Sequence, residues 1–153
     1  MADWSDVPVF GIRDDRKTVV RPSAYGLTAD AVGRIAVVQT SLGLFLPGGG
    51  IDGDETPSET VVREFWEECG LEVTTGPWSV RAIDFVYSPN DRVVFEKLST
   101  FIDATCTERR GVGQEPDHEL EWVTADIAVA RLRDPSARWA VEQWLARTAE
   151  PTS

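Results

Sequence analysis

The segment from Thr56 to Gly70 constrains the fold most, because both ends of a helix can be recognised in it. Thr56 is a favourable N-cap, Pro57 suits the first helical turn, and Glu59 three residues after the cap completes a capping box. Gly70 is a residue type at which helices commonly end, because it adopts the left-handed conformation without a Cβ clash. The sequence therefore predicts a helix over residues 57–69.

The predicted helix has two faces of different character. Apolar side chains gather on the side that we expect to pack on a sheet: Val62, Phe65, Trp66 and Cys69. Glu64, Glu67 and Glu68 lie together roughly opposite. Carboxylates three and four positions apart on a helix repel each other by about 0.2–0.5 kcal/mol per pair. Most acidic faces of this kind are solvated surfaces, and the alternative is that a cation lies over this one.

A strand-like run leads into three glycines just before this helix. Residues 43–50 read GLFLPGGG, an apolar stretch followed by a glycine-rich loop whose backbone can approach a ligand closely. Oxygen ligands are what Mg²⁺ and Mn²⁺ prefer, and Mg²⁺ usually shares its coordination shell with substrate phosphates. A cation held over the three glutamates would turn their mutual repulsion into a binding site.

The rest of the chain alternates short strand-like runs with turns and ends in two helices. Strands are predicted over residues 18–30, 34–40, 78–88, 92–106 and 120–124, and helices over 125–132 and 135–148. This order is neither repeated β–α–β nor all β, and it favours an α+β sandwich with a mixed sheet and helices on its two faces. We expect one domain over residues 18–148, an N-terminal lead-in over 1–17 and a C-terminal tail over 149–153.

Charge and composition exclude several classes of function. The 153 residues suffice for one ordinary domain, and their net charge of −11 argues against a binder of nucleic-acid polymers or anionic membranes. Cys69 and Cys106 do not have the spacing of a disulfide framework or a metal site, and His118 is the single histidine. The N-terminus does not resemble a secretory signal, so we expect a cytoplasmic protein, as a monomer or homodimer.

From Gly49 onward, the chain resembles the Nudix box of the Nudix hydrolase superfamily. That pattern is Gly-x5-Glu-x7-Arg-Glu-U-x-Glu-Glu-x-Gly-U, where U is a bulky aliphatic residue. The matching residues are Gly49, Glu55, Arg63, Glu64, Glu67, Glu68, Gly70 and Leu71. Phe65 at the first U position is the single departure, and it is still a bulky apolar residue. With its flanking segments, the resemblance covers about residues 18 to 148.

This resemblance implies a Nudix-type α/β/α sandwich and a Mg²⁺-dependent hydrolysis of a nucleoside diphosphate linked to another moiety, with Mn²⁺ as a substitute cation. It implies that Glu67 and Glu68 are the main metal ligands, helped by Glu64 and the carbonyl of Gly48. It further implies that Arg63 orients the carboxylates, through Glu55 and Glu67, with Gly49 in support. The alternative for Arg63 is a plain ion pair with Glu59 on the helix surface.

The general base and the substrate are less narrowly defined. By the resemblance, the base is either Glu64 in the box or a glutamate of a later loop, and of these we favour Glu119, as base or as extra metal ligand. Its alternative is a solvated carboxylate. Tyr87 has the spacing of a tyrosine in dinucleoside polyphosphate hydrolases and is predicted to stack on a base, or else to pack locally. Arg21 is a candidate phosphate contact.

The sequence supports three hypotheses about the function. The first is a pyrophosphohydrolase of a nucleotide or dinucleoside polyphosphate, with a small-molecule substrate. The second is a house-cleaning hydrolase of modified nucleoside triphosphates. The third is a non-catalytic nucleotide-sensing module, which the intact set of three glutamates disfavours.

Overall fold

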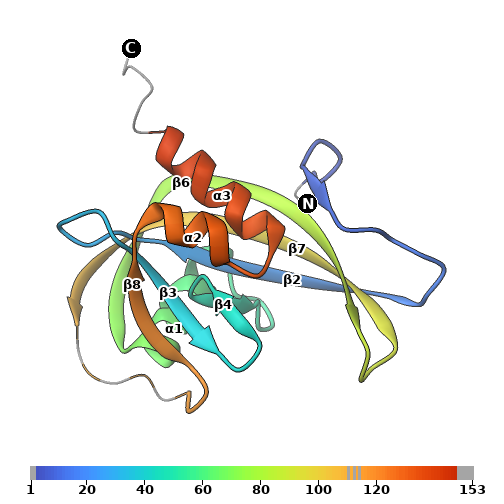
Figure 1. Cartoon of the computed structure of the whole chain (residues 1–153), viewed down its shortest axis with the longest axis horizontal. Coiled ribbons are helices and arrows are strands. Elements are labelled where there is room, and N and C mark those ends of the chain that lie inside the picture. The colour runs from blue at the N-terminus through green and yellow to red at the C-terminus, as the bar shows by residue number, and fades with distance from the viewer. Residues whose placement is uncertain (1–2, 110, 112, 114, 148–153) are drawn as a thin grey trace.

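Two β-sheets form the framework of the described part of the chain. The computed structural model describes residues 3–109, 111, 113 and 115–147. Five strands form one sheet in the order β1-β6-β7-β2-β5. Their bounds are β1 (Val9–Phe10), β2 (Thr18–Leu27), β5 (Gly48–Gly50), β6 (Leu71–Ser88) and β7 (Val93–Arg109). A second sheet consists of β3 (Ile35–Thr40), β4 (Gly43–Phe45) and β8 (Glu119–Val123) (Figure 1).

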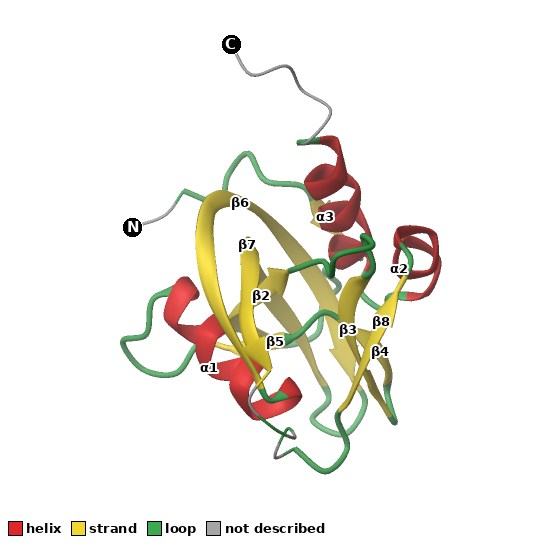
Figure 2. Ribbon diagram, turned by 90° about the vertical axis from the view of Figure 1, so that its left-hand side faces the viewer, coloured by secondary structure: helices red, strands yellow, loops and turns green. Residues whose placement is uncertain are grey.

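The five-stranded sheet is mixed, as predicted. Strand β1 runs parallel to β6 and β2 parallel to β7, whereas β6 with β7 and β2 with β5 are antiparallel. Three helices flank the sheets: α1 (Pro57–Cys69), α2 (Ala125–Arg131) and α3 (Pro135–Ala146). Helix α1 lies on one side, and α2 and α3 lie on the other (Figure 2). The predicted α+β class and α/β/α layering are confirmed.

Helix α1 begins and ends at the predicted residues. Thr56 accepts a hydrogen bond from the backbone N–H of Glu59, and the Glu59 carboxylate accepts one from the N–H of Thr56, which completes the capping box. Gly70 ends the helix in the left-handed conformation, with φ of 65°. The Glu59 carboxylate therefore binds the helix start, and Arg63 binds other carboxylates.

The predicted packing face of α1 is wrong at two positions. Val62 and Trp66 are each 41% exposed, whereas Val61 and Phe65 are fully buried. The buried stripe thus lies one residue to the side of the predicted one, and Glu68 is turned inward on it. Phe65 fits because Gly26 faces it, where a Cβ atom would lie 2.4 Å from the ring. The aromatic departure from the box pattern is therefore accommodated in the core.

The predicted strand and loop over residues 43–50 divide between the two sheets. Strand β4 pairs with β3, and after Pro47 the glycines form β5, which pairs with β2. A side chain at Gly48 would overlap the carbonyl oxygen of Ala24 at 2.2 Å, and its φ of 152° favours glycine. The close pairing brings β5 directly alongside α1.

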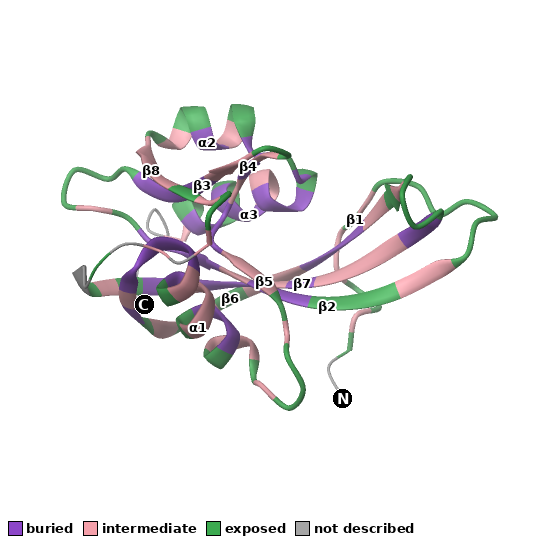
Figure 3. Cartoon of the chain, turned by 90° about the horizontal axis from the view of Figure 1, so that it is seen from below, coloured by how far each residue is buried: buried purple, intermediate pink, exposed green. Residues whose placement is uncertain are grey.

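Strand β6 is longer than predicted, and β1 lies in the predicted lead-in. Strand β6 begins at Leu71, ahead of the predicted start at Trp78, and continues through Gly76 and Pro77 with a register shift between Thr75 and Ser79. The start of β2, the end of β6 and the start of β7 extend beyond the helices as an arm (Figure 3). Within the described residues, no helix has the length and apolar character needed to cross a bilayer.

Candidate active site

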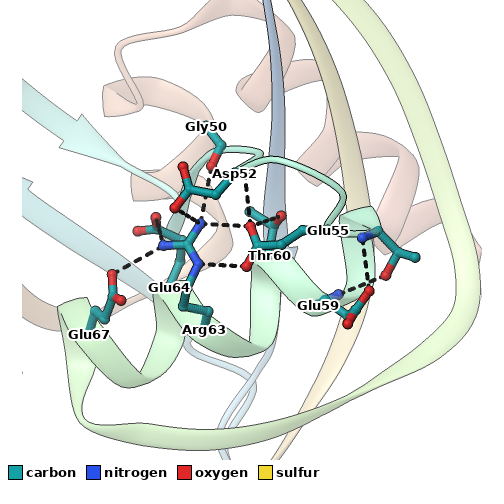
Figure 4. Close-up of polar contacts among 9 residues, drawn as sticks. Gly50, Asp52, Glu55, Glu59, Thr60, Arg63, Glu64 and Glu67 are labelled. Carbon is teal, nitrogen blue, oxygen red and sulfur yellow. Dashed lines mark hydrogen bonds and ion pairs between the residues drawn. The ribbon is translucent and has the colours of Figure 1, made fainter.

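Arg63 is the centre of the polar cluster on α1 (Figure 4). Its guanidinium donates to both carboxylate oxygens of Glu55, at 2.7 and 3.0 Å. The same group donates to Glu64 at 2.8 Å and to Glu67 at 3.2 Å. A further bond to the carbonyl oxygen of Gly50, at 3.2 Å, joins the helix to β5. Arg63 thus contacts the carboxylates that sequence reasoning assigned to it.

Charge pairing stabilises the ionised forms of Glu55 and Arg63. The Arg63 guanidinium, with the Asp52 N–H and the Thr60 hydroxyl, lowers the pKa of Glu55 to about 2. Glu55 and Glu64 in turn raise the pKa of Arg63. Glu55 is therefore ionised at neutral pH. From the loop before the helix, its two oxygens hold the planar guanidinium of Arg63 in place.

Glu68 is the buried carboxylate of the cluster. Its side chain is 6% exposed. One oxygen, Oε1, accepts a 2.8 Å hydrogen bond from the backbone N–H of Gly48, and the other, Oε2, lies 3.2 Å from Nε2 of His118. Burial and the nearby charges of Glu64 and Glu115 raise the pKa of Glu68 to about 9, against the lowering effect of the Gly48 N–H.

Glu64 and Glu67 flank this buried carboxylate. The side chain of Glu64 is 14% exposed, and burial raises its pKa despite the contact with Arg63. Gly49 leaves room for it, since a Cβ atom there would lie 3.1 Å from Glu64 Oε1. Glu67 is more exposed, at 38%, and faces the solvent edge. The predicted metal ligands therefore share one surface, between α1 and β5.

The donor set fits a hard divalent cation. Within the described ranges, no three acidic, histidine or cysteine side chains already converge as a closed coordination shell. Glu64 and Glu67 turn toward Arg63 instead. Burial is the main cause of the raised pKa values of Glu64 and Glu68, and repulsion by neighbouring carboxylates adds to it. A cation beside these carboxylates would favour their ionised forms, and oxygen-only donors suit Mg²⁺ or Mn²⁺.

The loop before β8 approaches the same cluster. Glu119, the favoured candidate base, lies at the exposed start of β8, opposite Gln39. Glu115 is the carboxylate of this loop whose charge affects Glu68. Gly113 packs on the end of α1, where a Cβ atom would lie 2.1 Å from the carbonyl oxygen of Glu68. The structure thus brings Glu115 and His118 toward Glu68 more directly than Glu119.

A cleft of about 600 Å³ opens beside Glu68 and β5. Its lining includes three cationic side chains, Arg21, Lys97 and Arg133, in a protein that is acidic as a whole. The aromatic residues of its wall are Tyr25, Phe45 and Phe95, and Tyr87 borders it at the end of β6. The two predicted substrate contacts, Arg21 and Tyr87, both border this cleft. Its size and its polar and aromatic lining suit a nucleotide-sized ligand.

The strand register puts the side chain of Tyr87 on a different face of the sheet from Phe95. Val86 is opposite Phe95 and Tyr87 is opposite Val94, and Phe95 lies beside the Arg21 guanidinium at 4.2 Å. Because side chains alternate along a strand, Tyr87 points to the other face of the sheet from Phe95. Its ring is 40% exposed and lies 4.0 Å from the guanidinium of Arg16.

Two features of the site were not predicted from the sequence. Lys97, in the cleft wall, binds Asp134 at 2.9 Å, and although burial lowers its pKa, Tyr25 and Asp134 raise it overall. The second feature is the contact of His118 with Glu68. No sequence pattern predicts either pair, because Lys97 and Asp134 are 37 residues apart and Glu68 and His118 are 50 residues apart.

Comparisons with known proteins agree with this geometry. The family model described as NUDIX domain matches residues 19–145. A MutT-like protein of Streptomyces ambofaciens is 34% identical over 94 residues, which are 58% of this chain and 58% of that relative. The chain therefore spans less than two thirds of that curated relative.

Two solved structures share the fold. The dihydroneopterin triphosphate pyrophosphohydrolase of E. coli has a TM-score of 0.64 at 19% identity, over 84% of this chain and 99% of that one. An Ap4A hydrolase of C. elegans has a TM-score of 0.64 at 15% identity, over 84% and 98%. At these identities the likeness concerns the fold alone.

Proposed function

The chain belongs to the NUDIX hydrolase family, and we propose that it is a Mg²⁺-dependent pyrophosphohydrolase that cleaves a nucleoside diphosphate linked to another moiety. The observation that carries this proposal is the position of Glu68. It lies in the wall of the cleft, beside Gly48 and close to Glu64. Cationic side chains line the same cleft. A diphosphate would meet a cation at the glutamates and further positive charge from Arg21 and Arg133, since Lys97 is already paired with Asp134.

Glu64, Glu67 and Glu68, with the carbonyl of Gly48, would hold Mg²⁺, or Mn²⁺ in its place. When bound, the cation neutralises charge on the bridging and leaving oxygens of the diphosphate. Arg63 fixes Glu64 and Glu67 from one side, and the backbone N–H of Gly48 fixes Glu68 from the other. These contacts hold the three carboxylates near one another before substrate binds.

A glutamate would remove the proton from the attacking water. We place Glu115 ahead of Glu119 for this role, because its charge reaches Glu68 while Glu119 lies exposed at the start of β8. Glu64 is the alternative within the helix. It has a raised pKa, which suits a base, but its Oε1 accepts a hydrogen bond from Arg63.

For the substrate, we propose a nucleotide or dinucleoside polyphosphate, and a modified nucleoside triphosphate as the second candidate. Phe95 and Arg21 form a stacked pair in the cleft, and such a platform suits a nucleobase. The C. elegans protein, named for Ap4A, and the E. coli protein, named for a pterin triphosphate, share this fold. We place the reaction in the cytoplasm, with a monomer or homodimer as the active form.

The test is hydrolysis of a substrate panel with Mg²⁺, with Mn²⁺, and with chelator. The panel contains nucleoside triphosphates, dinucleoside polyphosphates, ADP-ribose and nucleotide sugars, and chromatography identifies the released products. Wild-type protein should cleave at least one compound between phosphorus atoms, and Glu68→Gln protein should not. Binding of a nucleotide without cleavage by wild type would favour the sensing module instead.

A further inference from the structure

His118 and Gly48 hold the two oxygens of one carboxylate. Gly48 donates its backbone N–H to Oε1 of Glu68, and Nε2 of His118 lies 3.2 Å from Oε2. A carboxylate bound at one oxygen can still rotate about its last bond. A second contact, at the other oxygen and from a different element, fixes its plane.

We propose that His118 is a positioning residue, which holds the Glu68 carboxylate in the orientation needed to bind the divalent cation. This inference rests on the proposed function, since it assigns Glu68 to a metal site. His118 acts through Glu68 and not on the substrate. In this role Nε2 carries the hydrogen and donates it to Oε2, because an ionised carboxylate only accepts hydrogen bonds.

The loop that carries His118 is held by a contact with the turn after β3 and by a bond within the loop itself. Asp117, the preceding residue, accepts hydrogen bonds from the hydroxyl and the backbone N–H of Ser41, at 2.8 and 3.2 Å. The backbone N–H of His118 donates to the carbonyl of Glu115 at 3.1 Å. Ser41 lies in the turn between β3 and β4. The second sheet therefore helps to fix the position of the His118 imidazole.

The surroundings of the ring agree with a fixed orientation. The His118 side chain is 29% exposed, but its Nδ1 atom is buried and has no hydrogen-bond partner among the described residues. Nε2 is therefore the nitrogen through which the ring is held. Gly113 packs on the backbone of Glu68 itself, so the same loop contacts this residue at both its side chain and its main chain.

The experiment measures Mn²⁺ affinity by isothermal titration calorimetry on the full-length protein. His118→Ala should weaken Mn²⁺ binding by about 10- to 100-fold, as is usual when a partner of a metal ligand is lost. His118→Gln should restore most of the affinity, because its amide N–H can donate to Glu68 from a similar place. Gln143→Ala, on the exposed side of α3, is the matched control and should bind like wild type.

The kinetic readout separates positioning from a structural role. With saturating Mn²⁺, His118→Ala should recover most of its turnover, and the KM for the nucleotide should stay near the wild-type value. Wild-type Mn²⁺ affinity in His118→Ala would overturn the inference and leave the proposed function intact. Equal loss of affinity in the alanine and glutamine variants would also overturn it. A wild-type protein whose Mn²⁺ affinity depends on His118 but which cleaves no substrate would overturn the proposed function alone.

Discussion

The carboxylate of Glu68 accepts a 2.8 Å hydrogen bond from the backbone N–H of Gly48, twenty residues earlier in the chain. This bond joins the last turn of α1 to β5 and fits a rotation of the helix in which Val61, Phe65 and Glu68 face inward. With Glu68 turned inward, Val62 and Trp66 face outward, although both are apolar. The helix thus exposes two large apolar side chains and buries a carboxylate at the candidate metal site.

Glu68→Gln should keep the fold and lose activity. The amide has the same shape, and its oxygen can still accept the Gly48 N–H, but the negative charge that a cation needs is gone. We expect kcat/KM to fall by at least about 100-fold, with weaker Mn²⁺ binding. Steady-state kinetics and calorimetry measure these changes, and circular dichroism checks the fold. Full activity in this variant would show that the cation is bound elsewhere.

Replacement of the general base should lower turnover and leave substrate affinity unchanged. We expect Glu115→Gln to reduce kcat by about 10²–10⁴-fold with little change in KM. Glu119→Gln should have a smaller effect, since Glu119 is exposed at the start of β8. The reverse order would restore the assignment made from sequence. A large loss in Glu64→Gln alone would place the base on α1.

The stability of the metal-free protein should depend on pH through Glu68. Its pKa rises from 4.5 to about 9 on folding, so the native state binds this proton more tightly than the unfolded chain. The resulting stabilisation is complete below pH 4.5 and is lost as the pH rises through about 9. Thermal melting in chelator should show this decline, and Glu68→Gln should weaken it, with a remainder from Glu64, whose pKa is also raised.

Mg²⁺ should stabilise the protein more at high pH than at low pH. The cation binds the deprotonated carboxylate, so its affinity increases as Glu68 loses its proton. We expect the rise in Tm on adding Mg²⁺ to be larger at pH 8.5 than at pH 6. Equal shifts at both pH values would mean that Glu68 does not bind the ion.

Arg63→Lys should impair the site although the charge is kept. A lysine cannot bind both oxygens of Glu55 and still reach Glu64 and Glu67. We expect kcat to fall by about 10- to 100-fold. Arg34→Lys is the matched control, because Arg34 pairs with Asp30 at the surface and should leave kcat unchanged. Similar kcat values in both variants would show that Arg63 contributes no more to catalysis than a surface ion pair does.

Base stacking should involve Phe95 more than Tyr87. Phe95 shares the cleft face with Arg21, whereas Tyr87 points to the other face of the sheet. If a base stacks on Phe95, Phe95→Ala should raise KM by about 5- to 150-fold, from a loss of about 1–3 kcal/mol. Turnover at saturation should change little, because the stacked base is remote from the reacting phosphorus. A larger effect of Tyr87→Ala would support the spacing-based prediction.

The sequence by itself determined the features that depend on residues close together along the chain. The capping box at Thr56, the stop at Gly70 and the crowding of three glutamates within five positions are local, and the structure contains all of them. The contact of Arg63 with Glu67 is also local, since residues four apart on a helix are adjacent. The mixed sheet followed from the order of strand and helix patterns.

The tertiary structure decided which glutamate is buried and what holds it. The apolar stripe through Val62 and Trp66 fits the helical period better, yet the buried stripe runs through Val61 and Glu68, so periodicity alone predicted the wrong rotation of α1. The choice depends on β5, which pairs with β2 where only glycine fits, and on the loop that brings His118 to Glu68. These partners are 20 and 50 residues from Glu68 along the chain, and only packing of the two sheets against the helix brings them together.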